Sequence, residues 1–160
     1  MTKVLILGSS GLLGSNISRV LDSKFEVIGT HFNNANHSVP HSIHLDIAST
    51  DMFEEIIKKV SPQYVINCIG WIKQKHININ KAYEINSQFP RLLSHLALIF
   101  NFKLIHVSTD CVFTGKKGNY SDNDHKDAKD LYGLSKNLGE IKNLNTVTLR
   151  TSIIGPEKGK

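Results

Sequence analysis

The stretch from Lys3 to Ser15, KVLILGSSGLLGS, constrains the fold of this chain more than any other feature. A run of β-favouring aliphatic residues leads into three glycines with the spacing G-x-x-G-x-x-G, and apolar residues then recur at helical spacing. The pattern predicts a strand, a tight turn and a helix start. Gly8 suits the turn, Gly11 lets a ligand approach the backbone, and Gly14 lets the helix pack closely on the strand.

The start of that helix predicts a binding site for the diphosphate of a dinucleotide. Free N–H groups and the positive end of the helix dipole face outward there. We expect Ser10, Leu12 and Leu13 to contact the cofactor together with the three glycines. A turn with a purely structural role is the alternative, but a position directly after a strand, followed by a βαβ rhythm, favours nucleotide binding.

The whole chain predicts an α/β, doubly wound, mostly parallel Rossmann-type sheet in the order 3-2-1-4-5-6, with helices on both faces. After the first strand we expect strands at 26–30, 42–45, 64–68, 103–107 and 146–150, and helices at 12–23, 51–60, 81–100 and 131–142. With 160 residues, the chain suffices for one NAD(P)-binding domain, residues 1–160, but is short for a two-domain enzyme.

The end of the second expected strand bears on the choice of cofactor. An acidic residue there would bind the adenosine ribose and repel a 2′-phosphate. The segment 29–34 reads GTHFNN without an acid, which favours NADP(H) over NAD(H), and we expect His31 to lie at the cofactor. After the third strand, Asp46 and Ile47 either form a turn or helix cap or contact the adenine.

Another ligand-facing segment follows the fourth expected strand, because ligands in such sheets bind beyond the carboxyl ends of the strands. We expect Cys68, Ile69 and Gly70 to face the cofactor, and Trp71 or Lys73 to border a substrate. For Trp71 the alternative is a half-buried packing residue.

The last expected helix carries a pair of residues suited to proton transfer. Tyr132 and Lys136 are four residues apart and therefore lie on one face. The reference pKa of a phenol is ~10, and a neighbouring ammonium favours the phenolate, so the lysine would help the tyrosine to exchange protons at neutral pH. Thr109, near the end of the fifth strand, brings a hydroxyl to the same sheet edge, where it could hydrogen-bond the same substrate oxygen.

Taken together, these segments resemble the extended short-chain dehydrogenases/reductases, and within them the dTDP-4-dehydrorhamnose reductase branch of nucleotide-sugar reductases. The similar segments span nearly the whole chain and comprise the glycine turn, STDCVFTGKKGNYSD at 108–122, YGLSK at 132–136 and LRTSIIG at 149–155. The resemblance implies that Tyr132 protonates the C4 oxygen of the sugar while hydride arrives from the nicotinamide. It also implies that Lys136 lowers the pKa of the tyrosine and binds the nicotinamide ribose.

The resemblance also assigns supporting roles. Thr109 would orient the keto group, and Asp46 and Ile47 would contact the adenine. Asn86 would support the lysine through a water molecule, although its spacing alone makes it a helix surface residue. The resemblance implies a continuation past the sixth strand with another strand and a smaller C-terminal substrate domain, and we expect that domain to be absent from this chain. We therefore expect weak cofactor binding and little turnover from these residues alone.

Departures from the family pattern concern the sugar pocket, where we expect substrate contacts from Thr109, Asp110 and Cys111. Relatives often have an aromatic residue where Cys111 stands and a tryptophan where Ile153 stands, so the sequence does not identify which sugar is bound. Nucleotide-sugar dehydratases need a glutamate at the position of Cys111, which argues against dehydration. An epimerase with the same Tyr and Lys is one alternative, and a non-catalytic regulatory subunit like that of methionine adenosyltransferase is another.

Composition limits the remaining classes. The net charge of +5 is spread thinly, which suits an anionic nucleotide-sugar and does not indicate nucleic-acid binding. Cys68 and Cys111 read as reduced thiols, and no segment reads as a signal peptide or membrane span, so we expect a cytoplasmic protein without a membrane partner. His37, His41 and His44 lack the scaffold of a metal site, so no metal is expected. A homodimer is compatible with the sequence.

Overall fold

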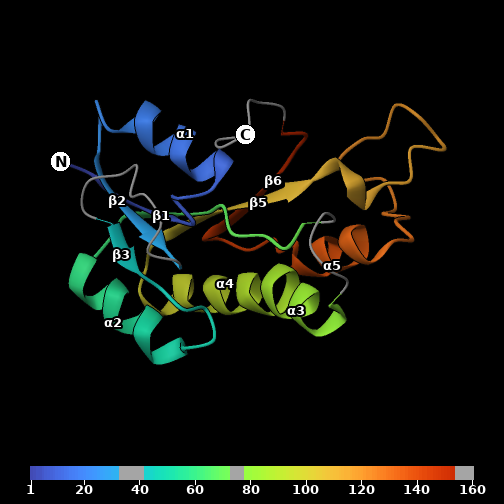
Figure 1. The fold of residues 1–160 in the computed structure, drawn as a ribbon. Coiled ribbons are helices and arrows are strands. Elements are labelled where there is room, and N and C mark those ends of the chain that lie inside the picture. The colour runs from blue at the N-terminus through green and yellow to red at the C-terminus, as the bar shows by residue number, and fades with distance from the viewer. Residues whose placement is uncertain (33–41, 73–77, 154–160) are drawn as a thin grey trace, which may run out of the picture.

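The computed structural model describes residues 1–32, 42–72 and 78–153 (Figure 1). Six parallel strands form one sheet in the order β3-β2-β1-β4-β5-β6, which confirms the predicted fold class and strand order. Their bounds are β1 (Lys3–Leu7), β2 (Glu26–His31), β3 (Ser42–His44), β4 (Tyr64–Asn67), β5 (Lys103–Thr109) and β6 (Thr146–Thr151). The strand order reverses between β1 and β4, and a crevice is expected beyond the carboxyl ends of these two strands.

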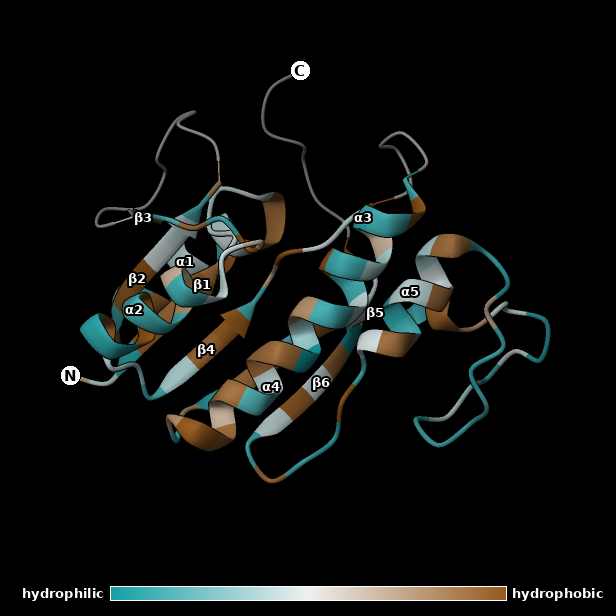
Figure 2. Ribbon diagram, turned by 90° about the horizontal axis from the view of Figure 1, so that it is seen from below, coloured by the Kyte–Doolittle hydropathy of each residue, from teal (hydrophilic) through white to brown (hydrophobic). Residues whose placement is uncertain are grey.

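Helices cover both faces of the sheet, as predicted. One face carries α1 (Leu12–Leu21), and the other carries α2 (Thr50–Val60), α3 (Ile79–Tyr83), α4 (Phe89–Ile99) and α5 (Leu131–Gly139) (Figure 1). Two short turns complete the described elements, the π-helical η1 (Glu84–Gln88) and the 3₁₀-helical η2 (Asp110–Val112). Segment 113–130, between η2 and α5, is hydrophilic along most of its length (Figure 2).

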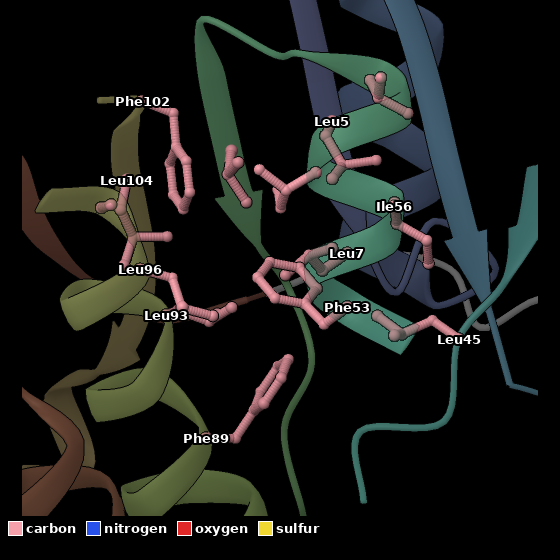
Figure 3. Packing of buried hydrophobic residues seen from close by; sticks show 14 residues of the cluster. Leu5, Leu7, Leu45, Phe53, Ile56, Phe89, Leu93, Leu96, Phe102 and Leu104 are labelled. Atoms are coloured by element: carbon pink, nitrogen blue, oxygen red, sulfur yellow. The ribbon is translucent and has the colours of Figure 1, made fainter. Parts of the chain in front are cut away.

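The main core lies between the sheet and the helices α2 and α4 (Figure 3). Strand residues such as Leu5 and Leu104 meet Phe53 and Leu93 from the helices, and the rings of Phe53 and Phe89 pack edge to face at 6.2 Å. A smaller cluster on the opposite face packs against α1. Because both faces of the central strands are covered with apolar side chains, the strand ends are held rigidly, and the residues that leave them are positioned accurately.

Two helices differ from their predicted form. The helix expected at 81–100 is interrupted by η1, because Pro90 has no N–H to bond the carbonyl of Asn86 four residues earlier. The apolar residues that recur at helical spacing in α1 are expected to face the sheet, but one of them, Val20, is 67% exposed. The helix instead turns Gly14, Ser15 and Ser18 toward the protein, and these small residues allow a close approach to the sheet.

Within the described ranges, none of the helices combines the length and the apolar character that crossing a bilayer requires.

Candidate functional site

The glycine turn between β1 and α1 has the shape that the sequence predicts. Gly8 has a positive φ of 77°, and its carbonyl accepts a hydrogen bond from the Gly11 N–H at 3.0 Å. A side chain at Gly14 could not be accommodated, because its Cβ would lie 2.3 Å from the Gly8 carbonyl oxygen. Gly11 caps α1 without a side-chain hydrogen bond, so the first N–H groups of the helix remain for a ligand. Ser10 is exposed at this end of the helix.

The end of β2 holds the glycine turn from the side. The hydroxyl of Thr30 accepts a hydrogen bond from the Gly8 N–H at 3.2 Å. The Thr30 carbonyl accepts one from the Ser9 N–H at 2.9 Å. His31 is buried, and its Nδ1 lies 2.7 Å from the Ser42 hydroxyl, so its ring is engaged with β3. Its expected contact with the cofactor stays a prediction.

Asp46 and Ile47 follow β3. The sequence left two alternatives for them, a turn or helix cap and a contact with the adenine. Asp46 Oδ1 accepts a hydrogen bond from the Ala48 N–H at 3.0 Å, which closes a local turn. Ile47 packs against the main core. The structure therefore shows the turn, and contact with an adenine stays a prediction.

The turn after β4 lies against the glycine turn. The Cys68 N–H donates to the Leu7 carbonyl at 3.0 Å, and a Cβ built on Gly8 would be 3.0 Å from Ile69 Cγ1. Burial raises the pKa of the Cys68 thiol to about 12, so it stays protonated. A Cβ on Gly70 would have no neighbour closer than 3.7 Å, so the backbone is open to a ligand at this point.

Asn86 is fully buried, which corrects its expected place on the helix surface. Its Oδ1 accepts the Trp71 N–H at 2.8 Å, and its Nδ2 donates to the Trp71 carbonyl and the Ser135 hydroxyl, both at 3.0 Å. The π-helical turn at Pro90 brings the side chain inward. Asn86 therefore fixes the turn after β4 to α5. A water-mediated contact with Lys136, implied by the family resemblance, stays a prediction.

Lys136 is buried, with only 4% of its surface exposed. Its Nζ donates to the Val107 carbonyl at 2.7 Å and would lie 4.0 Å from a Cβ on Gly70. Burial lowers the pKa of Lys136 from 10.5 to about 8, and the charge of Glu140 offsets part of that effect. Tyr132 is half-buried one helical turn earlier on α5.

Thr109 is placed at the end of β5 as predicted, but its hydroxyl serves a local turn. The Oγ1 atom accepts the Cys111 N–H at 3.1 Å and donates to Asp110 Oδ1 at 3.2 Å. The Asp110 carboxylate also accepts a hydrogen bond from the Ser152 hydroxyl, which lowers the pKa of Asp110. A contact between Thr109 and a keto group stays a prediction.

Two of the expected substrate residues, Asp110 and Cys111, line a hollow of about 390 Å³ beside η2. Its other walls come from segment 113–130 and from Arg150 on β6: Phe113, Thr114, Gly115, Tyr120, Ser121 and Asp122. Trp71 is half-buried and lies elsewhere, below Lys81, whose Nζ is 6.0 Å from the indole ring. Lys73, His37 and His41 lie outside the described residues. In the described part of the chain, no three acidic, histidine or cysteine side chains cluster as a metal site would need.

A charged cluster surrounds Glu140, and the sequence patterns did not predict it. This carboxylate accepts hydrogen bonds from Ser108 at 2.8 Å and from Arg150 at 2.9 Å on each oxygen, and Lys126 lies 2.8 Å away. Burial alone would raise the pKa of Glu140, but these bonds outweigh it and lower the pKa from 4.5 to about 2. The one available signal was the spacing of four residues after Lys136.

Acid should weaken this cluster. Because the folded pKa of Glu140 lies below 4.5, its stabilisation is complete above about pH 4.5 and is lost as the pH falls toward 2. We expect the free energy of unfolding to fall by on the order of 2–3 kcal/mol over this range, and Glu140→Gln to abolish that part of the slope. Urea unfolding at a series of pH values measures it.

A matched control is Glu26→Gln, because the Glu26 side chain is 49% exposed and pairs with Lys3 only at 3.8 Å. In this variant the free energy of unfolding should fall between pH 4.5 and 2 by the same amount as in the unaltered chain, to within about 0.5 kcal/mol. Equal slopes for the Glu140→Gln variant and the unaltered chain would contradict the role of the cluster.

The sheet order, the glycine turn and the Tyr132–Lys136 helix define a Rossmann-type fold of the short-chain dehydrogenase/reductase class. More narrowly, the chain belongs to the RmlD substrate binding domain family, whose model matches residues 1–160.

Individual relatives agree with this assignment. The chain is 32% identical over 161 residues to a dTDP-4-dehydrorhamnose reductase from Aggregatibacter actinomycetemcomitans, covering 95% of this chain and 51% of the relative. It is 30% identical over 160 residues to the spore coat polysaccharide biosynthesis protein SpsK of Bacillus subtilis, with 95% and 53% covered. The chain therefore spans about half the length of these relatives. A methionine adenosyltransferase 2 subunit beta from Danio rerio is 24% identical, with 86% and 42% covered.

Solved structures show the same fold. The crystal structure of a hypothetical dTDP-4-dehydrorhamnose reductase from Sulfolobus tokodaii superimposes with a TM-score of 0.84 at 33% identity, over 93% of this chain and 55% of that one. A dTDP-4-dehydrorhamnose reductase from Bacillus anthracis in complex with NADP has a TM-score of 0.80 at 24% identity, over 99% and 57% of the two chains.

Proposed function

We propose that this chain forms the dinucleotide-binding part of an NAD(P)H-dependent reductase that acts on a 4-keto-6-deoxy nucleotide-sugar. The observation that carries the proposal is the placement of Lys136, whose buried ammonium lies beside Gly70 at the strand-order reversal, one helical turn after Tyr132. The relatives named as dTDP-4-dehydrorhamnose reductases support this choice of substrate class.

The residues present fit a dinucleotide. The uncapped start of α1 leaves hydrogen-bond donors for a diphosphate, and Gly70 leaves room further along the crevice. When bound, the reduced nicotinamide supplies a hydride. We infer a preference for NADP(H), because segment 26–32 at the end of β2 has no acid after Glu26 to repel a 2′-phosphate. The NADP complex of the Bacillus anthracis structure supports the same inference.

The protein side chains would complete the reduction by transferring one proton to the substrate oxygen. As the C4 carbonyl is reduced to C–O–H, the Tyr132 hydroxyl would give its proton to the oxygen. The Lys136 ammonium, fixed by the Val107 carbonyl, stabilises the negative charge left on the phenol oxygen. Thr109 would orient the keto group, which requires its hydroxyl to share the bonds that it makes in the η2 turn.

The biological setting is part of the proposal. The likeness to the SpsK protein supports a place in the synthesis of a surface polysaccharide. A cytoplasmic location and a homodimer remain predictions. The likeness to methionine adenosyltransferase 2 subunit beta favours one alternative, a regulatory subunit with a nucleotide pocket and no turnover.

A two-stage assay tests the proposal. We expect fluorescence titration to show that the chain binds NADPH more tightly than NADH. With protein in excess, a dTDP-4-keto-6-deoxy sugar should then oxidise bound NADPH slowly. NADPH binding without any oxidation would favour the regulatory subunit, and no binding of either nucleotide would contradict the proposal altogether.

Gly70→Ala provides a specific probe of the crevice. The new methyl group would point toward Asn86 Oδ1 and Lys136 Nζ, 3.7 and 4.0 Å away, without meeting protein atoms more closely. We expect the variant to fold normally and to bind NADPH about tenfold more weakly, because the methyl group takes space left for the ligand. Unchanged NADPH affinity in this variant would place the dinucleotide elsewhere.

A further inference from the structure

Two buried polar side chains behind the crevice have no part in the reaction described above. Asn67 ends β4, His106 lies opposite it in the register of β5, and both are fully buried. Asn67 Nδ2 lies 3.1 Å from His106 Nδ1. A buried polar pair in an otherwise apolar sheet calls for a physical reason.

The hydrogen bonds determine which atom donates. Asn67 Oδ1 accepts the Ile69 N–H at 3.1 Å, so the amide nitrogen must be the group that faces His106. An amide nitrogen only donates, so Nδ1 accepts and the neutral ring carries its proton on Nε2. Burial, together with the positive charge of Lys136, lowers the pKa of His106 from 6.5 to about 3, so the ring is neutral near pH 7.

A purely structural role explains this histidine poorly. Its Nε2 is buried without a partner among the described residues, and an orphaned N–H is unfavourable in a protein interior. An apolar side chain would fill the same place in β5 without that cost. The benefit must therefore come from Nδ1 and the bond that it accepts from Asn67.

The hydrogen bond between Asn67 and His106 is connected to the crevice through Ile69. Ile69, whose N–H is held by Asn67, packs against Gly8 of the glycine turn, and Gly70 follows at the open point beside Lys136. The far end of the same turn is held at Trp71 by Asn86. Two buried amides thus hold the turn after β4, and His106 orients the one nearer the glycine turn.

We propose that His106 is a positioning residue for the dinucleotide site, which fixes the Ile69 peptide against the glycine turn by orienting the Asn67 amide. This inference rests on the proposed function, since it assigns the hydrogen bonds from His106 through Asn67 to Ile69 to the cofactor crevice. Without the acceptor, the Asn67 amide is free to turn away from Ile69, and the fraction of molecules with a correctly shaped crevice falls.

Two variants separate this role from general packing. His106→Leu keeps an apolar volume but removes the acceptor, whereas His106→Asn places Oδ1 close to the former Nδ1 and leaves a void beyond it. Both should lower the midpoint of urea unfolding. We expect about tenfold weaker NADPH binding and about tenfold faster amide hydrogen exchange at Ile69 in His106→Leu only. Ser94→Ala, which removes a buried hydrogen bond to Thr146, is a control for stability loss away from the crevice.

The outcomes are distinct. Equal NADPH affinity and equal Ile69 exchange in the Leu and Asn variants would overturn the inference. So would a ¹⁵N spectrum of the unaltered protein with the His106 proton on Nδ1, a measurement that stands even if His106→Leu does not fold. If the unaltered chain binds no NADPH, the proposed function fails, and exchange at Ile69 still decides whether His106 holds the turn.

Discussion

Gly139→Ala is expected to destabilise the protein by about 3 kcal/mol or more, because the added methyl group has nowhere to go. A Cβ on Gly139 would lie 1.9 Å from the Asn86 carbonyl oxygen and 3.0 Å from its carbonyl carbon. Both are backbone atoms of η1, so the clash can be relieved only by moving α5 away from the π-helical turn. Lys136 and Tyr132 are on α5, so both would be displaced at the same time.

Chemical denaturation followed by circular dichroism measures this loss. Gly70→Ala is the matched control, because the same methyl group meets nothing closer than 3.7 Å there, and its stability should differ from that of the unaltered chain by less than about 1 kcal/mol. If Gly139→Ala unfolds at the same denaturant concentration as Gly70→Ala, the close packing of α5 on η1 is incorrect.

Tyr132→Phe is expected to slow reduction of a 4-keto nucleotide-sugar by roughly 10²- to 10⁴-fold, because it removes the hydroxyl that we propose as the proton donor. The ring stays half-buried on α5, so the NADPH affinity should change by less than about threefold. A single-turnover measurement, with protein in excess over the sugar and NADPH oxidation followed by fluorescence, gives the rate constant of the reduction step. A rate constant equal to that of the unaltered protein would remove Tyr132 from the reaction.

Tyr64→Phe serves as the control for the loss of a phenolic hydroxyl. Tyr64 begins β4, at the opposite end of the strand from the crevice, and its side chain is 41% exposed. We expect no change in the rate of sugar reduction for this variant. A similar loss in both variants would indicate a general effect on folding instead of a missing proton donor.

Much of the fold followed from local patterns. Alternation and apolar runs predicted every strand to within two residues at either end, since strands covered on both faces need continuous apolar stretches. The glycine spacing predicted the turn at Gly8 and the close packing at Gly14, because only a missing Cβ permits those backbone positions. The spacing of Tyr132 and Lys136 likewise placed both residues on the same helix.

Errors arose where one element changes the geometry of another. Pro90 interrupts the single helix expected at 81–100, and the resulting π-helical turn η1 buries Asn86. Helical periodicity had placed Asn86 at the surface. The contact of Thr109 with a substrate stays a prediction, but spacing did not indicate that its hydroxyl also takes part in the η2 turn that follows it. Propensity and spacing describe regular elements and do not report such local competition for hydrogen bonds.

The sequence alone predicted the sheet order from the βαβ rhythm along the whole chain, and it predicted the glycine turn and the shared helix of Tyr132 and Lys136 from residues close together. Only the tertiary structure decided which side chains hold the crevice in shape. Asn67 meets His106 across 39 residues, and Asn86 meets Ser135 across 49. Such contacts are set by strand register and by the approach of helices, which no local pattern contains, and a buried polar group gains its role only from the partner that the fold brings to it.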